Sequence, residues 1–228
     1  GRSGRSGSAA RLTLTRCGGR GLIVIPLGVK QEFTRDAAML GIEVRVIRRI
    51  EECGDDGIYL TNYETVRDGK LDPKHFKVAS LDEASALRGF GGTKTFRVFM
   101  AQFAGDDRAA GVQHEGVPYR YLATATPSPN EYIELLAYAA YLDVMDVGQA
   151  KTRFFKRDST KADCLTIHPH KEAEFWLWVA SWALFVTKPS DVDPAFSNLG
   201  YDLPQLDVRW HEIPSDHRNA GYEKDGQA

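Results

Sequence analysis

Two adjacent acidic residues, Asp82 and Glu83, follow the short apolar run VASL and precede several small residues. An aspartate at the carboxyl end of a parallel strand faces the crevice in which α/β proteins bind ligands. There it can hold a Mg²⁺ ion directly or through water, and a neighbouring glutamate can orient or deprotonate an attacking water. Taken alone, the pair more often marks an ordinary solvated strand end, so the metal interpretation needs support from the rest of the chain.

A second candidate is the basic stretch KTRFFKRDSTK, which begins at Lys151 and surrounds Phe154 and Phe155 with cations. Cations interleaved with aromatic rings suit nucleic-acid backbones and bases, and Lys156 and Arg157 are the contacts that this pattern favours. The alternative is a solvated basic loop whose phenylalanines pack in the core.

Two further patterns favour ordinary structural roles. The spacing C-x3-H-x-H from Cys164 to His170 lacks a second ligand pair and matches no structural zinc pattern well. Three tryptophans share one strongly apolar segment, where packing in the core or against another lobe is favoured over base stacking: Trp176, Trp178 and Trp182.

The composition is that of an ordinary globular protein: 228 residues, 43% hydrophobic and 26% charged. A formal net charge of −2 means that any nucleic-acid contact must come from a local basic patch. Three widely spaced cysteines indicate a reducing compartment rather than a disulfide framework. Because no apolar run reaches the roughly 18 residues of a membrane span and no signal peptide is visible, we expect a cytoplasmic protein.

The elements that must position these residues follow from the apolar pattern. Five strands alternate with helical or turn segments, which indicates βαβ units and a parallel sheet: residues 22–27, 43–50, 57–64, 75–83 and 120–127. The pattern predicts helices over residues 30–40, 131–145 and 171–187, and a possible short strand over 206–213. Residues 1–8 contain only Gly, Arg and Ser and are expected to be flexible.

Four segments occur in an order that resembles the motifs of Snf-type, chromatin-remodeler-like helicases. LIVIPLGVKQEF (22–33) resembles the strand and helix that touch nucleic-acid backbone, and YLTNYETV (59–66) resembles the following motif. VASLDEASALRG (78–89) is similar to a Walker B motif in its DExx form, and YLATATPSPNEYIEL (121–135) is similar to the coupling motif. The whole chain resembles helicase-related proteins of phages and prophages.

This resemblance implies an α/β fold of the RecA-like, P-loop NTPase type, with a parallel sheet flanked by helices and a helical C-terminal extension. It implies ATP and Mg²⁺ as cofactors. Asp82 would coordinate Mg²⁺ on the β- and γ-phosphates, and Glu83 would activate the hydrolytic water. Thr124 and Thr126 would sense the state of the nucleotide.

The same resemblance implies duplex DNA as the partner, held through its backbone in a bacterial or phage-infected cell. Lys30 and the strand end formed by Thr61, Asn62 and Tyr63 would contact that backbone. Such contacts need only donors and positive charge, so a nearly neutral protein can make them.

The chain departs from the family pattern in two places. It contains no Gly-Lys-Ser or Gly-Lys-Thr, and the position of that phosphate loop is taken by GRSGRSGSAA, which we interpret as a damaged, truncated or replaced N-terminus. The second RecA-like lobe is expected as a partner but absent, and the linker to it would begin near residue 190. Because an arginine finger from that lobe contributes about 10³–10⁵ in rate, we expect little ATP hydrolysis by this polypeptide alone.

We therefore predict a flexible or truncated N-terminus (1–20), a first RecA-like lobe (21–140), a helical extension (141–190) and a loosely ordered tail or linker (191–228). The expected function is that of an ATP-dependent DNA helicase or translocase lobe, inactive alone, and whether the chain is itself an enzyme stays open. The alternative is a nucleic-acid-binding or partner-binding remnant without ATPase activity. A metal-dependent nuclease would need further carboxylates near Asp82, and the sequence offers no clear set.

Overall fold

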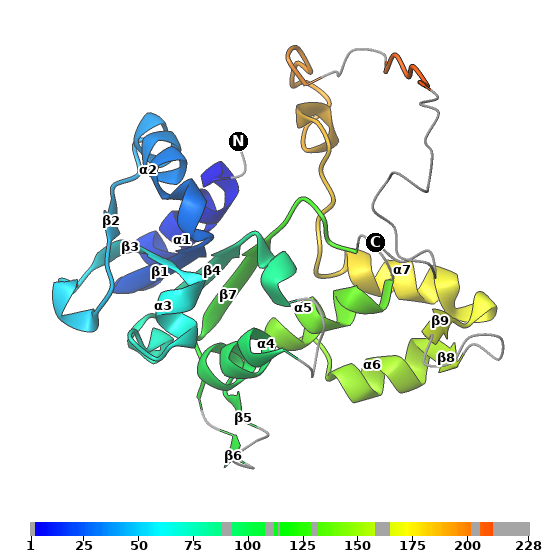
Figure 1. Ribbon diagram of the computed structural model, residues 1–228, viewed down its shortest axis with the longest axis horizontal. Coiled ribbons are helices and arrows are strands. Elements are labelled where there is room, and N and C mark those ends of the chain that lie inside the picture. Colours follow the sequence, from blue (N-terminus) through cyan, green and yellow to red (C-terminus); the bar gives the residue numbers. More distant parts are fainter. Residues whose placement is uncertain are drawn as a thin grey trace, which may run out of the picture. The chain divides into compact units, whose positions relative to one another are not determined.

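The computed structural model describes most of the chain: residues 3–87, 93–107, 112–113, 115–128, 132–157, 165–201 and 206–211 (Figure 1). The chain divides into two compact units, Gly1–Trp182 and Ala183–Ala228. Among the described residues, no helix combines the length and apolarity needed to cross a bilayer.

The first unit is built on a five-stranded sheet with the order β2-β3-β1-β4-β7, in which every pair is parallel. Its strands are β1 (Arg20–Ile25), β2 (Val44–Val46), β3 (Gly57–Asn62), β4 (Val78–Asp82) and β7 (Tyr119–Ala123). The predicted parallel α/β sheet is confirmed, and each of its five strands falls within or beside its predicted range. Two small antiparallel pairs lie outside this sheet: β5 (Asp106–Asp107) with β6 (Val112–Gln113), and β8 (Phe155–Arg157) with β9 (Leu165–Ile167).

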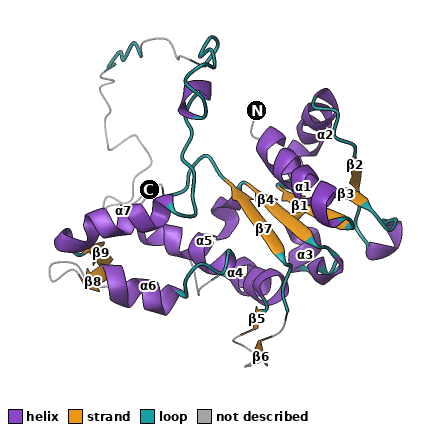
Figure 2. Cartoon of the chain, turned by 180° about the vertical axis from the view of Figure 1, so that it is seen from behind, coloured by secondary structure: helices purple, strands orange, loops and turns teal. Residues whose placement is uncertain are grey.

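Helices flank the sheet, as predicted. Helices α1 and α2 lie on one side of it and α3 and α4 lie on the other (Figures 1 and 2). The helices are α1 (Ser3–Cys17), α2 (Lys30–Met39), α3 (Tyr63–Arg67), α4 (Lys94–Phe99), α5 (Leu135–Tyr141), α6 (Val147–Phe154) and α7 (Glu172–Ala180), with a π-helix η5 (Met100–Ala104) after α4.

The central strand β1 shows why this sheet needs cover on both faces. Leu22, Ile23 and Val24 are completely buried although successive side chains of a strand point to opposite faces. On one face Ile23 joins a core with Phe33 of α2 and Ala10 of α1. A continuous apolar strand is therefore stable here because helices remove both of its faces from water.

Helix α1 corrects the prediction of a flexible N-terminus. Ala10 is fully buried, and the Thr13 hydroxyl lies 2.7 Å from the Tyr121 hydroxyl of β7. The Arg11 guanidinium donates to the carbonyl oxygen of Gly41 at 3.4 Å, beyond the end of α2. Glycine and serine disfavour a helix in isolation, but packing against the sheet outweighs this local preference.

The C-terminal helices of the first unit pack through aromatic rings. Phe154 contacts Phe175 and Trp178 with ring-centroid distances of 5.4 and 5.1 Å, and Phe155 contacts Phe175 at 5.6 Å. Both phenylalanines of the basic stretch are buried, so core packing is their role in the fold. The predicted helix over 171–187 is too long, because α7 ends at Ala180.

The second unit contains one short 3₁₀ helix, η8 (Pro189–Asp191), among its described residues. The Asp191 carboxylate accepts hydrogen bonds from the Thr187 hydroxyl (2.6 Å) and the Lys188 amide (3.0 Å). These bonds, led by that of the hydroxyl, lower the pKa of Asp191 to about 2. The strand predicted over 206–213 is not formed in Leu206–His211, the described part of that range.

Candidate functional site

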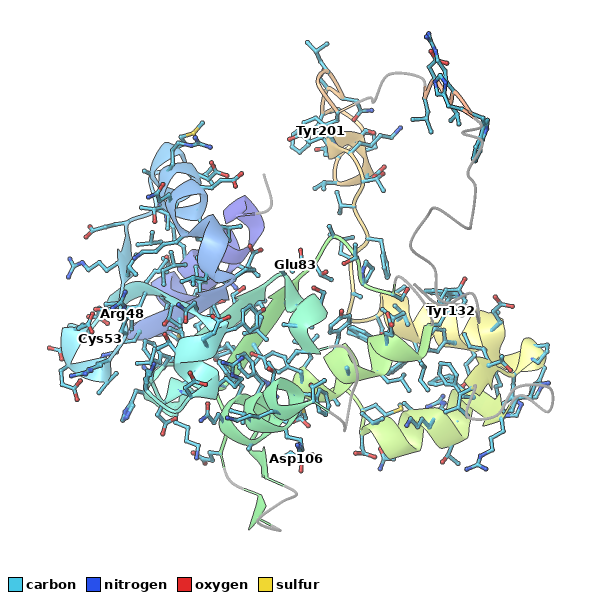
Figure 3. The ribbon with its side chains drawn as sticks, viewed as in Figure 1. Arg48, Cys53, Glu83, Asp106, Tyr132 and Tyr201 are labelled. Atoms are coloured by element: carbon cyan, nitrogen blue, oxygen red, sulfur yellow. The ribbon has the colours of Figure 1, made fainter. Side chains whose placement is uncertain are left out.

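The acidic pair lies at the carboxyl end of β4, where the register of the sheet places it beside β7. Asp82 pairs with Ala123, so Glu83 and Thr124 are the next residues along these two strands. The Thr124 hydroxyl donates to Glu83 Oε1 at 3.0 Å, and the Thr126 amide donates to Thr124 Oγ1 at 3.1 Å. The structure thus brings together Asp82, Glu83, Thr124 and Thr126 (Figure 3 labels Glu83).

Glu83 has an unusual backbone conformation. Its φ of 57° lies in the left-handed region, which a residue with a side chain rarely adopts because Cβ approaches the backbone. Strain of this kind persists only where surrounding contacts impose it, and it gathers at functional sites. Asp82, one residue earlier, is 8% exposed, so its carboxylate sits in a largely enclosed position at the strand end.

Tyr63, from the preceding motif (59–66), contacts the acidic pair. Its hydroxyl donates to the carbonyl oxygen of Asp82 at 2.9 Å, and its side chain is 7% exposed. Burial, with smaller contributions from neighbouring ionisable groups that include Asp82 and Glu83, raises the pKa of Tyr63 well above its ordinary value. The hydroxyl therefore remains a proton donor throughout the neutral pH range.

The other predicted nucleic-acid contacts line a small pocket at the ends of β1, β2 and β3. Lys30, Thr61 and Asn62 share it with Arg48 and an apolar floor that includes Leu60. Lys30 and Arg48 are exposed cations, and Figure 3 labels Arg48. Sequence reasoning missed Arg48, although the run VRVIRRI carries a visible concentration of positive charge.

The polar side chains of this pocket have partners within the protein. The Thr61 hydroxyl is buried and donates to the carbonyl oxygen of Ile47 at 3.1 Å. Asn62 Oδ1 accepts from the Thr65 amide at 2.8 Å and caps α3. These contacts order the strand end, so the exposed charge of the pocket comes from Lys30 and Arg48.

The remaining sequence candidates lie on other elements. Lys156 and Arg157 are exposed on β8 and are not brought to the acidic pair. The rings of His168 and His170 have centroids 5.3 Å apart, and Cys164 lies outside the described residues.

The donor set at Asp82 fits a hard cation that is bound mainly by other ligands. A carboxylate is the donor that Mg²⁺ prefers, and Mg²⁺ usually takes one or two carboxylates together with phosphate oxygens and water. Within the described part of the chain, no group of three or more His, Cys, Asp or Glu side chains could hold a metal ion by itself. Asp82 therefore fits a Mg²⁺ ion that arrives with a phosphorylated ligand.

Strand order, flanking helices and polar residues at the carboxyl ends of β4 and β7 define an α/β domain of the RecA-like class. No protein-family model matches the chain, and a search of curated proteins finds no similar sequence. Among solved structures, the Sulfolobus solfataricus SWI2/SNF2 ATPase core in complex with dsDNA has a TM-score of 0.55 at 17% identity. That alignment covers 78% of this chain and 35% of the archaeal chain, so this protein spans about a third of that chain's length.

A second solved structure, the UvsW helicase from bacteriophage T4, has a TM-score of 0.40 at 15% identity and covers 62% of this chain and 48% of its own. A TM-score of 0.40 is too low to establish a shared fold. At 17% identity, the similarity to the SWI2/SNF2 ATPase core supports the fold and does not by itself indicate function.

Proposed function

We propose that this chain is the first lobe of an ATP-dependent DNA translocase or helicase related to phage proteins of the Snf type. The observation that carries the proposal is the contact between Glu83 and Thr124 at the carboxyl ends of adjacent parallel strands. It joins the Walker B-like acids to the TATP segment, as a nucleotide-sensing site requires. The dsDNA named for the SWI2/SNF2 structure agrees with this proposal.

In this function each acid has a separate role. Asp82 would hold the Mg²⁺ ion that accompanies a bound ATP, and that ion would supply positive charge beside the phosphates. Glu83 orients the attacking water or accepts its proton. Thr124 holds the Glu83 carboxylate, and Thr126 connects this position to the segment that follows β7.

The DNA backbone contacts are proposed for the pocket of Lys30, Arg48, Thr61 and Asn62. Two exposed cations at the strand ends supply the charge that phosphate contacts need. Thr61 and Asn62 are hydrogen-bonded within the protein, so Lys30 and Arg48 are the groups that would contact DNA phosphates. DNA binding at this pocket therefore depends on charge rather than on base sequence. Lys156 and Arg157 form a separate candidate contact on β8.

The second candidate function is a DNA-binding lobe that does not hydrolyse ATP. It is favoured by the pocket with Lys30 and Arg48, because these exposed cations do not depend on a bound nucleotide. In this case the acidic pair would be structural, and the pocket with Lys30 and Arg48 would keep its role.

Hydrolysis of ATP stimulated by duplex DNA separates the two candidates when it is measured on the full-length gene product that contains this chain. For the translocase we expect Asp82→Ala to lower kcat by removing the proposed Mg²⁺ ligand. We expect Glu83→Gln to lower kcat by about 10²–10⁴-fold, the range for loss of a group that transfers a proton. Glu172→Gln, at an exposed acid of α7, is the matched control and should leave the rate unchanged. Absent hydrolysis, or equal rates in all three variants, would leave only the DNA-binding candidate.

Binding of the 228-residue chain to duplex DNA over a series of salt concentrations tests the pocket. We expect Lys30→Glu and Arg48→Glu to weaken binding and to reduce the salt slope by about one for each phosphate that is no longer neutralised. Arg16→Glu is the control. Arg16 is exposed in the last turn of α1, close to the amino end of β1, whereas the pocket lies at the carboxyl ends of the strands. Weaker binding confined to Lys156→Glu and Arg157→Glu would move the interface to β8.

A further inference from the structure

Tyr63 stands between the two regions described above. It directly follows Asn62, which lines the pocket with Lys30, and its hydroxyl reaches the carbonyl oxygen of Asp82 at 2.9 Å. One side chain therefore joins the end of β3 to the end of β4, across β1, which pairs with both strands.

The hydrogen bond falls on the peptide group that links Asp82 to Glu83. A bond to this carbonyl fixes the plane of the peptide, and φ of Glu83 is the rotation measured from that plane. With the plane fixed, Glu83 is held at a φ of 57° with its carboxylate in contact with the Thr124 hydroxyl. Rotation of the peptide toward a negative φ of Glu83 would relieve backbone strain, and the hydrogen bond from Tyr63 opposes that rotation.

The Tyr63 ring is itself fixed by a column of aromatic side chains. It stacks on Phe99 with ring centroids 5.3 Å apart and an interplanar angle of 17°. Phe99 stacks on Phe103 at 4.9 Å, and Phe103 contacts Tyr141 of α5 at 5.8 Å. Contacts of this kind limit rotation of the Tyr63 ring and keep its hydroxyl within hydrogen-bonding distance of the Asp82 carbonyl oxygen.

We propose that Tyr63 is a positioning residue that holds the Asp82–Glu83 peptide in the orientation that presents the Glu83 carboxylate. The inference rests on the proposed function for its meaning, because the carboxylate it places is the proposed base. It assigns to Tyr63 a role inside the protein, distinct from the contact with DNA backbone that the sequence motif implied. A shift of the Thr61–Asn62 segment when DNA binds would move this hydroxyl and so change the position of Glu83.

The test is the backbone conformation of Glu83 in Tyr63→Phe, read by NMR on the whole chain labelled with ¹⁵N-glutamate and ¹⁵N-threonine. A residue with positive φ gives a strong NOE between its own amide and Hα protons, because the two lie close together. We expect this NOE at Glu83 in the unaltered chain and its loss in Tyr63→Phe, together with a changed Thr124 resonance. An unchanged Glu83 NOE in a folded Tyr63→Phe would overturn the proposal.

Tyr59→Phe is the matched control. Tyr59 is a fully buried tyrosine of β3, the strand that precedes Tyr63, and its hydroxyl accepts from the Gly54 amide at 2.7 Å and donates to the Asp56 carbonyl oxygen at 2.9 Å. Removal of this hydroxyl also breaks two hydrogen bonds, which are partly buried. Its partners Gly54 and Asp56 lie before the start of β3, whereas Tyr63 follows the end of that strand, so the Glu83 NOE should persist. Loss of the NOE in both variants would show a general loosening of the sheet and would contradict a specific role for Tyr63.

A second measurement needs no variant, should Tyr63→Phe fail to fold. With tyrosine labelled with ¹³C at Cζ in an equal mixture of H₂O and D₂O, a slowly exchanging hydroxyl gives two resolved lines. We expect two lines for Tyr63, and a single averaged line would contradict the buried bond. Neither measurement involves nucleotide, so a failed ATPase assay would overturn the proposed function and leave the position of Tyr63 decided separately.

Discussion

Glu83 combines a reactive group with an unfavourable backbone. Its left-handed φ of 57° costs about 1–2 kcal/mol for a residue with a Cβ. The bonds from Tyr63 to the Asp82 carbonyl and from Thr124 to the Glu83 carboxylate are among the contacts that maintain it. The residue is therefore held where its carboxylate contacts Thr124 rather than where its backbone is most stable.

Two substitutions at this position separate the backbone from the carboxylate. Both Glu83→Gly and Glu83→Ala remove the carboxylate, but only glycine adopts a positive φ without strain. We expect Glu83→Gly to be more stable than Glu83→Ala by about 1 kcal/mol in urea-induced unfolding. Equal stabilities would show that the strain is absent in solution.

At the scale of single residues, the order of motifs in the sequence predicted that Asp82, Glu83, Thr124 and Thr126 belong to one site, and the structure places them together. The inward orientation of Tyr63 was not predictable in this way. Tyr63 and Asp82 are 19 residues apart, and their contact depends on how α3 leaves β3. Sequence patterns locate strand ends, but they do not give the direction of a side chain beyond them.

Two glycines show how closely the elements of the first unit approach one another. A Cβ added to Gly116 would lie 2.2 Å from the carbonyl oxygen of Phe103, in the backbone of the π-helix η5. A Cβ added to Gly21 of β1 would lie 2.8 Å from Leu14 Cδ1, at the end of a flexible side chain of α1. The first contact is with backbone that also accepts a hydrogen bond from the Val117 amide at 2.7 Å, so it cannot move freely.

This difference predicts a ranking of three alanine substitutions. Gly116→Ala should destabilise the fold by about 3 kcal/mol, and Gly21→Ala by about 1 kcal/mol, because a side chain can move aside and a backbone cannot. Gly28→Ala should be nearly neutral, since no atom lies within 4 Å of its added Cβ. Chemical denaturation measures all three, and Leu14→Ala combined with Gly21→Ala tests the assigned contact. A Gly116→Ala variant as stable as Gly28→Ala would contradict the packing described here.

At the scale of elements, continuous apolar runs made the buried strands predictable, because a parallel sheet with covered faces has that pattern. Helix α1 was not predictable, since its Gly, Ser and Arg residues carry no apolar periodicity before Ala9. Its stability comes from tertiary contacts such as the burial of Ala10. The end of α7 at Ala180 was also missed, because the apolar run continues to Val186 with only Ser181 as a polar residue in it.

The buried apolar residues of the described chain all belong to the first unit, and the last of them is Val179. In the second unit, large apolar side chains are exposed, including Leu199 at 91% and Trp210 at 90%. The two units therefore differ in what stabilises them: a shared core in the first, and local hydrogen bonds such as those of Asp191 in the second.

A chain that ends after Trp182 should keep the fold of the first unit. We expect its thermal unfolding to stay cooperative, because every described residue of the sheet and of the buried core is retained. Near-ultraviolet circular dichroism of the buried aromatic residues measures the retained packing. Loss of the near-ultraviolet circular dichroism signal at room temperature would show that residues after Trp182 are required for the core.

The exposed apolar side chains of the second unit also determine which proteases can recognise it. Chain segments with few buried anchors are the usual sites of nicking. Between Ala183 and Tyr201 the only basic residue is Lys188, and Pro189 follows it, so trypsin-like enzymes have no favourable bond there. Enzymes that cleave after large apolar residues meet Phe185, Phe196 and Leu199, all of them exposed. Limited proteolysis of this segment should therefore require proteases of the second kind.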